Sequence, residues 1–268
     1  LIENAGALFN VLLLLMLVPA YLTTVRLGLN AAPNWTRGWR VAALGVLGVT
    51  VLTASFVQKL VFTQYADTST AVVLAMAGYL LWRLLSIVAK EDDFNSDPNI
   101  LAWQIGFVFA ALLFLKQTNL VLMVLVLAGA CVAALRDPKV RFWVFVRLLP
   151  ATLLPGLIVY LGWRYHVSQN IPIGEFSFLP REAWLTDHVF TILSKMASIA
   201  SNKGGYFAMM GMLSAAGIWN LFRYHGAFSR FALMVATVFL GYTVFLWAMY
   251  VMVFGPYEGM RAASFWRY

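Results

Sequence analysis

The sequence predicts an all-α, polytopic integral membrane protein, and both its composition and its apolar runs indicate this class. The 268 residues are 62% hydrophobic and only 11% charged, with a mean hydropathy of +0.80. A soluble domain of this size needs more charge on its surface. Apolar runs of about 18 residues or more, long enough for a membrane-spanning helix, recur along the chain. They are continuous rather than alternating, which favours helices over a barrel of strands.

About eight membrane-spanning helices are expected, joined mostly by short polar loops. Their approximate ranges are 5–25, 41–62, 67–88, 100–115, 119–135, 145–164, 206–222 and 229–254. Pro19, Pro150 and Pro155 are the main expected breaks within them. Residues 1–268 are expected to form one partial transmembrane domain of a longer protein, because the chain starts almost within the first span and stops where another helix is expected to begin.

The one long polar loop, 166–205, is expected to contain a helix of its own. Between Glu182 and Ala200 the apolar residues recur with helical spacing along one stripe, and Gly204-Gly205 ends the pattern. This pattern predicts an amphipathic helix that lies in the plane of the membrane interface.

The charged residues fall between the apolar runs and sort into two sides. Eleven of the 19 basic residues lie on the side reached after the first, third, fifth and seventh spans: Arg26, Arg37, Arg40, Arg83, Lys90, Arg136, Lys139, Arg141, Arg147, Arg223 and Arg230. Such an excess in short loops predicts the cytoplasmic side. The opposite side mixes acids and bases: Lys59, Asp67, Lys116, Arg164, Glu175, Arg181, Glu258, Arg261 and Arg267. This mixture suits a charged substrate at the membrane surface. The net charge of +8 does not indicate nucleic-acid binding, because most of it lies in the short loops where a positive excess is expected in a membrane protein.

Asp67 is the first candidate for a functional residue. It lies at the expected start of the third span, within Gln64-Tyr65-Ala66-Asp67-Thr68. A carboxylate at a helix N-terminus is stabilised by the macrodipole and the free N–H groups, so a plain helix cap is the simpler interpretation. The alternative is a base, a metal ligand or the partner of a lysine, since a polar group at membrane depth is costly without a partner.

Lys116 is the second candidate, and Asn119 stands beside it. Lys116 separates two apolar runs that are each shorter than about 20 residues, so the turn between them is expected at or below the bilayer surface. Its ammonium could extend to the surface along its aliphatic stem, or it could bind a phosphate with Gln117, Thr118 and Asn119 as neighbouring donors. The sequence leaves these two interpretations open.

Arg261 and Arg267 are further candidates for a phosphate contact, because a guanidinium donates two parallel hydrogen bonds. A basic and aromatic belt at the interface is the alternative, given Phe265 and Trp266 between them. The sequence has no HExxH or CxxC spacing, no glycine-rich phosphate loop and no GxSxG elbow. Its single cysteine, Cys131, also excludes a disulfide within the chain.

Three short segments resemble the bacterial polytopic glycosyltransferases of the GT-C fold. Phe62-Thr63-Gln64-Tyr65-Ala66-Asp67 is similar to their Tyr-x-Asp segment. Leu113-Phe114-Leu115-Lys116-Gln117-Thr118-Asn119-Leu120 resembles their leucine–lysine–polar hairpin between two spans, and Ala262-Ala263-Ser264-Phe265-Trp266-Arg267-Tyr268 resembles a later segment that ends in Arg-Tyr. The order and spacing of the motifs agree over about 70–268.

The resemblance implies transfer of a sugar from a polyprenyl-phosphate carrier on the periplasmic face of a bacterial inner membrane, in the synthesis of envelope polysaccharide or glycoconjugate. Asp67 would be the second acidic residue of the site, with the main base expected upstream of residue 1. Lys116 and Arg267 would contact the carrier phosphate, with Tyr65, Asn119 and Arg261 as further substrate contacts. A divalent ion, Mg²⁺ or Mn²⁺, could bridge acid and phosphate, and no other cofactor is expected.

Two other functions compete with the glycosyltransferase. A transporter or flippase of lipid-linked sugars should carry charges near the bilayer midplane and interrupt its helices there. The charges of this chain gather instead at helix ends on one side, which favours the enzyme. A structural or assembly subunit would give no reason for the mixture of acids and bases on the outer side.

Overall fold

The computed structural model describes residues 2–28, 39–50, 66–91, 97–170, 179–202, 204–223, 226–262 and 265, and all regular structure in these ranges is helical. This confirms the all-α prediction. Five helices are long and apolar enough to cross a membrane: α5 (Ala66–Val88), α6 (Pro98–Leu115), α7 (Leu120–Arg136), α8 (Phe142–Asn170) and α11 (Ala227–Met252). They support an integral membrane protein.

Eight spans are not confirmed, and the differences lie at both ends of the chain. The first predicted span is two helices, α1 (Ile2–Met16) and α2 (Val18–Gly28), which meet at Leu17. Pro19 lies in the first turn of α2, where its missing N–H is tolerated and where it interrupts the preceding helix. α3 (Trp39–Thr50) covers only the first half of 41–62, and the second half lies outside the described residues. α10 (Gly204–Arg223) is long enough but is not among the five spans, because glycines and polar residues dilute its apolar character.

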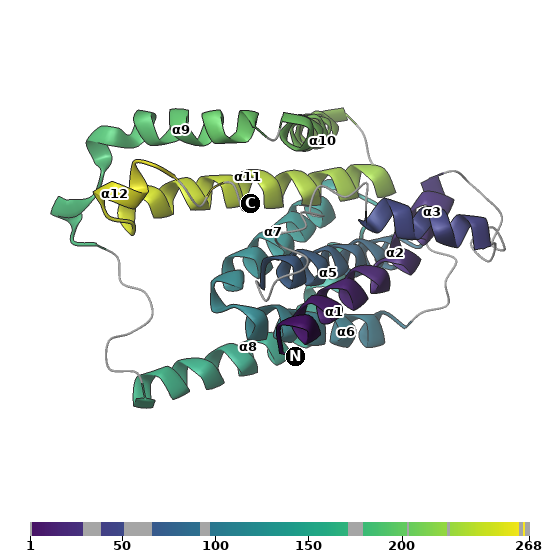
Figure 1. Cartoon of the computed structure of the whole chain (residues 1–268). Helices are drawn as coiled ribbons and strands as arrows, with labels where there is room; N and C mark the ends of the chain where they lie inside the picture. The colour runs from purple at the N-terminus through teal and green to yellow at the C-terminus, as the bar shows by residue number, and fades with distance from the viewer. Residues whose placement is uncertain are drawn as a thin grey trace.

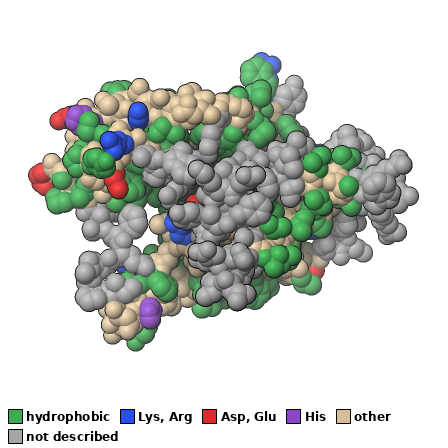
Figure 2. All heavy atoms as spheres, in the orientation of Figure 1, with side chains coloured by type: hydrophobic (Ala, Val, Ile, Leu, Met, Phe, Trp, Pro, Cys, Tyr) green, Lys and Arg blue, Asp and Glu red, His purple; other side chains and the backbone are tan. Residues whose placement is uncertain are grey.

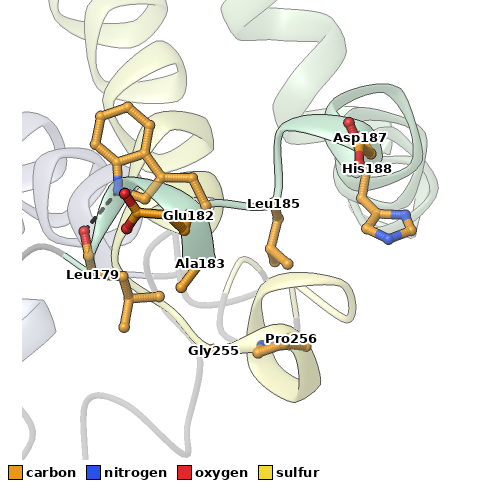
Figure 3. Close-up of a pocket in the computed structure, with 9 residues that line it drawn as sticks. Leu179, Glu182, Ala183, Leu185, Asp187, His188, Gly255 and Pro256 are labelled. Carbon is orange, nitrogen blue, oxygen red and sulfur yellow. Dashed lines mark hydrogen bonds between the residues drawn. The ribbon is translucent and has the colours of Figure 1, made fainter.

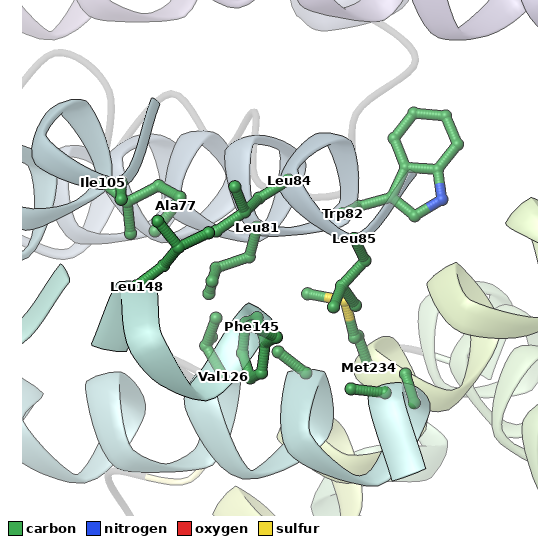
Figure 4. Close-up of a cluster of buried hydrophobic side chains, with 14 of the residues drawn as sticks. Ala77, Leu81, Trp82, Leu84, Leu85, Ile105, Val126, Phe145, Leu148 and Met234 are labelled. Atoms are coloured by element: carbon green, nitrogen blue, oxygen red, sulfur yellow. The ribbon is translucent and has the colours of Figure 1, made fainter. Parts of the chain in front are cut away.

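The core forms where α5, α6, α7, α8 and α11 meet (Figure 1, Figure 4). On α5 the buried residues Ala77, Leu81, Leu84 and Leu85 recur at helical spacing, so one face of this helix points inward. Large apolar residues such as Phe107 and Trp143 point outward and are exposed. An apolar exterior is what lipid favours.

The predicted breaks at Pro150 and Pro155 do not occur, because α8 continues through both residues. Pro155 has no N–H to donate to the carbonyl of Ala151 one turn earlier. α6 approaches closely at this point: a Cβ added to Gly106 would lie 2.5 Å from the Ala151 oxygen and 2.9 Å from the Pro155 ring. Gly106 therefore lets the two backbones approach, as small residues do between membrane helices.

The described helices carry charge at two opposite ends of the bundle. We call one the Asp67 end; it holds the start of α5, the turn between α6 and α7, and the end of α11. We call the other the Arg230 end; it holds the residues after α5 and α7 and the start of α11. This agrees with the two-sided sorting of charges, and the cytoplasmic orientation of the Arg230 end stays a prediction.

Arg230 is a buried cation that fastens three helices together at the Arg230 end. Its side chain is 1% exposed and donates to Asp137 and to Glu91 at 2.5 Å each. Asp137 follows α7 and is 3% exposed, while Glu91 follows α5 and also accepts from the Lys139 ammonium at 2.8 Å. The sequence predicts Arg230 only as one of the basic residues of the cytoplasmic side, because both of its acidic partners are distant in the chain.

The same cluster predicts a stability that depends on acid pH. Burial by itself raises the pKa of Asp137 and of Glu91, but hydrogen bonds from Lys139 and Arg230 outweigh it and hold both pKa values below their ordinary range. A lowered folded-state pKa stabilises the fold above the unfolded-state pKa, near pH 4, and this contribution is lost as the pH falls through the folded-state value. The thermal midpoint should therefore be flat from about pH 8 to 5.5 and should decline below about pH 4.5. An equal decline in Arg230→Met would contradict this origin.

The amphipathic helix predicted within 182–200 is present as α9 (Val189–Ser201). It starts later than expected because Arg181–Ala183 and Thr186–His188 form single 3-10 turns. Its buried residues Ile192 and Met196 pack against the last turns of α11, beside which α9 runs in Figure 1. The apolar stripe thus covers protein, and the location of α9 in the membrane interface stays a prediction.

Candidate functional site

The candidate site lies at the Asp67 end, where the structure brings together the two residues that the sequence singled out. Lys116 Nζ lies 3.9 Å from Asp67 Oδ1, although 48 positions separate them in the chain. The Lys116 and Asp67 side chains are 44% and 23% exposed, so the pair is loose and only partly covered by protein. An exposed pair of this kind adds little stability, and both groups stay accessible to a charged ligand.

Asp67 lies within the first turn of α5, which begins at Ala66. It is therefore not the residue that precedes the helix, as a plain cap would be. The structure thus gives Asp67 the partner lysine that was one of its functional alternatives.

Asn119 positions the turn that carries Lys116. Its amide group donates to the carbonyl of Leu112 at 2.9 Å, in the last turn of α6, and to Thr70 Oγ1 at 3.1 Å, on α5. The residue is 3% exposed. Both amide hydrogens are therefore used within the protein, and Asn119 holds the α6–α7 turn against α5. Lys116 itself has extended backbone between α6 and the short 3-10 turn Gln117–Asn119.

Small polar side chains that the sequence did not single out lie next to Asp67. Thr68 and Ser69 are buried in the first turn of α5, and Ser69 donates to Asn10 of α1 at 2.6 Å. The hydroxyl of Thr68 is buried and has no hydrogen-bond partner among the described residues. Thr68-Ser69-Thr70 at the head of an apolar helix, and Asn10 within an apolar run, were the available signals.

The register of the helices predicts that Lys116 lies near a membrane boundary. α6 has 18 residues and is about 27 Å long, slightly less than a hydrocarbon core of about 30 Å. A Cβ on Gly156 of α8 would touch Phe109 of α6 at 3.5 Å, and the two helices run in the same direction. Two turns further along, Lys116 is level with Trp163, which is followed by Arg164. A tryptophan and an arginine are typical of the interface.

The other candidate residues are not gathered at the pair within the described residues. Arg261 is exposed next to the short helix α12 (Pro256–Gly259), and its guanidinium stacks over the Tyr257 ring at 4.3 Å. Tyr65 and Arg267 lie outside the described residues, as does Glu175.

Among the described residues no group of three or more His, Cys, Asp or Glu side chains that could hold a metal ion is found. The predicted divalent ion between an acid and the carrier phosphate stays a prediction. The chemistry open to this part of the chain is that of an acid–base pair at a membrane surface: anion binding by Lys116 and proton exchange or orientation by Asp67.

Comparison of the chain with protein-family models, with curated proteins and with solved structures finds no match. The resemblance to GT-C glycosyltransferases accordingly depends on the three short sequence segments alone.

Proposed function

We propose that the chain belongs to a membrane glycosyltransferase that moves a sugar from a polyprenyl-phosphate carrier to an acceptor at the Asp67 end. The observation that supports this proposal is the approach of Lys116 to Asp67 within 3.9 Å, at the ends of helices long enough to cross a membrane. A polyprenyl phosphate keeps its chain in the bilayer and its phosphate at the membrane surface, within reach of the Lys116 ammonium.

In the proposed reaction an acceptor hydroxyl attacks the anomeric carbon of the sugar. The new glycosidic bond forms as the bond between that carbon and the carrier phosphate oxygen breaks, and the phosphate leaves with the electron pair. Lys116 stabilises the negative charge that develops on the departing phosphate. A carboxylate accepts the hydroxyl proton in such a displacement. Asp67 is the acidic group beside the ammonium, at 3.9 Å.

The continuity of the long helices favours the enzyme over a transporter or flippase. Transport sites of lipid-linked substrates are expected at interrupted helices near the midplane. α8 runs unbroken for 29 residues through both prolines, and α5, α6, α7 and α11 are also continuous. The described ion pairs lie at the ends of these helices, not at their centres.

Replacing Lys116 with alanine is expected to reduce the polyprenyl phosphate that co-purifies with the full-length protein by about tenfold or more. A charge-assisted hydrogen bond to phosphate contributes about 1.5–3 kcal/mol, and 1.4 kcal/mol is a factor of ten. Native mass spectrometry of the wild type and of Lys116→Ala in activity-preserving detergent measures the bound carrier.

Lys195→Ala is the matched control, because it removes the same charge from an exposed lysine of α9. Carrier lost equally from both variants, or bound to no form of the protein, would contradict a phosphate site at Lys116. Transfer of labelled sugar to acceptor in proteoliposomes then separates the enzyme from a flippase, which would move the donor without forming product.

A further inference from the structure

A cavity of about 370 Å³ opens at the Asp67 end, apart from the Asp67–Lys116 pair. Its lining comes from the segment before α9 and from the start of α12: Leu179, Glu182, Ala183, Trp184, Leu185, Asp187, His188, Gly255 and Pro256. The volume falls in the range of about 300–1,000 Å³ that small-molecule sites occupy. In Figure 3, Glu182 stands on one side and Asp187 with His188 on the other, with Leu185 and Pro256 between them.

The walls of this cavity are fixed to the end of α11. The backbone N–H of Leu179 donates to the carbonyl of Met252 at 3.1 Å, and that of Leu185 donates to Val251 at 3.0 Å. The indole N–H of Trp184 donates to the carbonyl of Leu179 at 2.8 Å, the bond drawn dashed in Figure 3. The aromatic ring is thus held in place and half-buried before any ligand arrives. A preformed site loses less conformational entropy on binding.

The described lining offers acids and no cation other than a histidine. Its two acids, Glu182 and Asp187, are both exposed, and no lysine or arginine is among the described residues that form it. The remaining lining is apolar or aromatic apart from His188 and the backbone. Figure 2 shows acidic, basic and histidine side chains gathered at this end of the visible face, over α12 and the start of α9. Carboxylates accept hydrogen bonds from hydroxyl and ammonium groups, whereas they repel a phosphate.

The cavity and the Asp67–Lys116 pair share one end of the bundle. α11 runs antiparallel to α7, because Gly129 lies against Met234 while Leu125 lies against Gly241. The end of α11 and the α6–α7 turn are therefore on the same side of the membrane. The two sites have opposite preferences, since Lys116 suits an anionic donor and the cavity suits a neutral or cationic molecule.

We propose that this cavity binds a small neutral or amino-bearing sugar, with Trp184 against the ring and Glu182 accepting from its hydroxyl or ammonium groups. The assignment of this sugar as the acceptor of the reaction rests on the proposed function; the binding itself does not. A pyranose has an apolar face for an aromatic ring and hydroxyls for carboxylates, which matches the composition of the lining.

Three sugars of matched ring size test the proposal: glucosamine, glucose and glucose 1-phosphate. Their dissociation constants are measured by titration calorimetry on the full-length protein in nanodiscs. Glucosamine should bind about threefold to fivefold more tightly than glucose, as expected for an exposed charge pair. Glucose 1-phosphate should bind more weakly than glucose in Lys116→Ala, in which the proposed phosphate site is removed.

Glu182→Gln should abolish the preference for glucosamine over glucose, and Trp184→Ala should raise the dissociation constants of all three sugars. Glu258→Gln is the matched control, since Glu258 is an exposed acid of α12 outside the lining, and it should leave the order unchanged. Tight binding of glucose 1-phosphate in Lys116→Ala, an unchanged preference in Glu182→Gln, or no binding of any sugar would overturn the proposal. Because free sugars are titrated without turnover, these outcomes do not depend on carrier binding at Lys116.

Discussion

Replacing Arg230 with methionine is expected to destabilise the protein by about 3–5 kcal/mol, the usual result of removing one partner of a buried ion pair. Methionine fills a similar volume but leaves Asp137, 3% exposed, and Glu91 without their shared cation. The backbone N–H groups of Lys139 and Gly226 still donate to Asp137 at 3.1 and 3.2 Å, and they do not neutralise its charge. The thermal midpoint in nanodiscs at pH 7.5 measures the loss.

Two further variants identify the cause of that loss. Arg223→Met removes an exposed arginine at the same end, stacked on Trp219 at 4.4 Å, and should change stability by less than about 0.5 kcal/mol. Arg230→Met combined with Asp137→Asn should recover part of the loss, since the uncompensated buried charge is then absent. An Arg230→Met protein as stable as Arg223→Met would show that the cluster does not hold the helices together.

Replacing Gly106 with alanine is expected to destabilise the protein by about 1–3 kcal/mol through overpacking between α6 and α8. The new Cβ would lie 2.5 Å from the Ala151 carbonyl oxygen and 2.9 Å from the Pro155 ring. Neither group is the end of a flexible side chain, so the helices themselves must separate. Alanine is intrinsically the better helix former by about 1 kcal/mol, so a net loss can come only from the contact.

Gly162→Ala is the matched control, for which no loss of stability is expected. Gly162 lies in α8, and a Cβ added there has no neighbour within 4 Å. This variant should be neutral or slightly stabilising, as helix propensity predicts. The comparison is made from thermal midpoints of the two purified variants. Equal behaviour of Gly106→Ala and Gly162→Ala would show that α6 and α8 have room between them at this point.

The sequence predicted the helices that depend on local patterns. Long apolar runs give α5, α6, α7, α8 and α11, and the apolar stripe within 182–200 gives α9. These signals are contained in each segment. The span over 5–25 is not confirmed as a membrane crossing, and the structure does have an interruption at Leu17, next to the break predicted at Pro19. The breaks predicted at Pro150 and Pro155 were wrong, since α8 continues through both residues, and proline is tolerated within membrane helices where the surroundings satisfy the freed backbone groups.

The two charged residues of the candidate site were predictable from the sequence, whereas the hydrogen bonds that position them were not. Asp67 and Lys116 could be selected as candidates because a charged group is costly within the membrane, and the structure places the two side chains 3.9 Å apart. The roles of Asn119 and Thr70 depend on hydrogen bonds between separate helices, which no local pattern contains. Arg230 shows the same limit: positive charge in a loop predicts its side of the membrane, and burial between Asp137 and Glu91 follows only from how α5, α7 and α11 meet.

The order of the Arg230 cluster along the chain has a consequence for biogenesis. Glu91 and Asp137 are synthesised well before Arg230, so both carboxylates emerge at the membrane surface before their cation exists. Until α11 has been inserted, the ends of α5 and α7 can be joined only by the more exposed Lys139–Glu91 pair, and Asp137 lacks the guanidinium of Arg230. Insertion of α11 is therefore the step that completes the cluster, and a nascent chain stalled before residue 230 should leave the Asp137 carboxylate without its cationic partner.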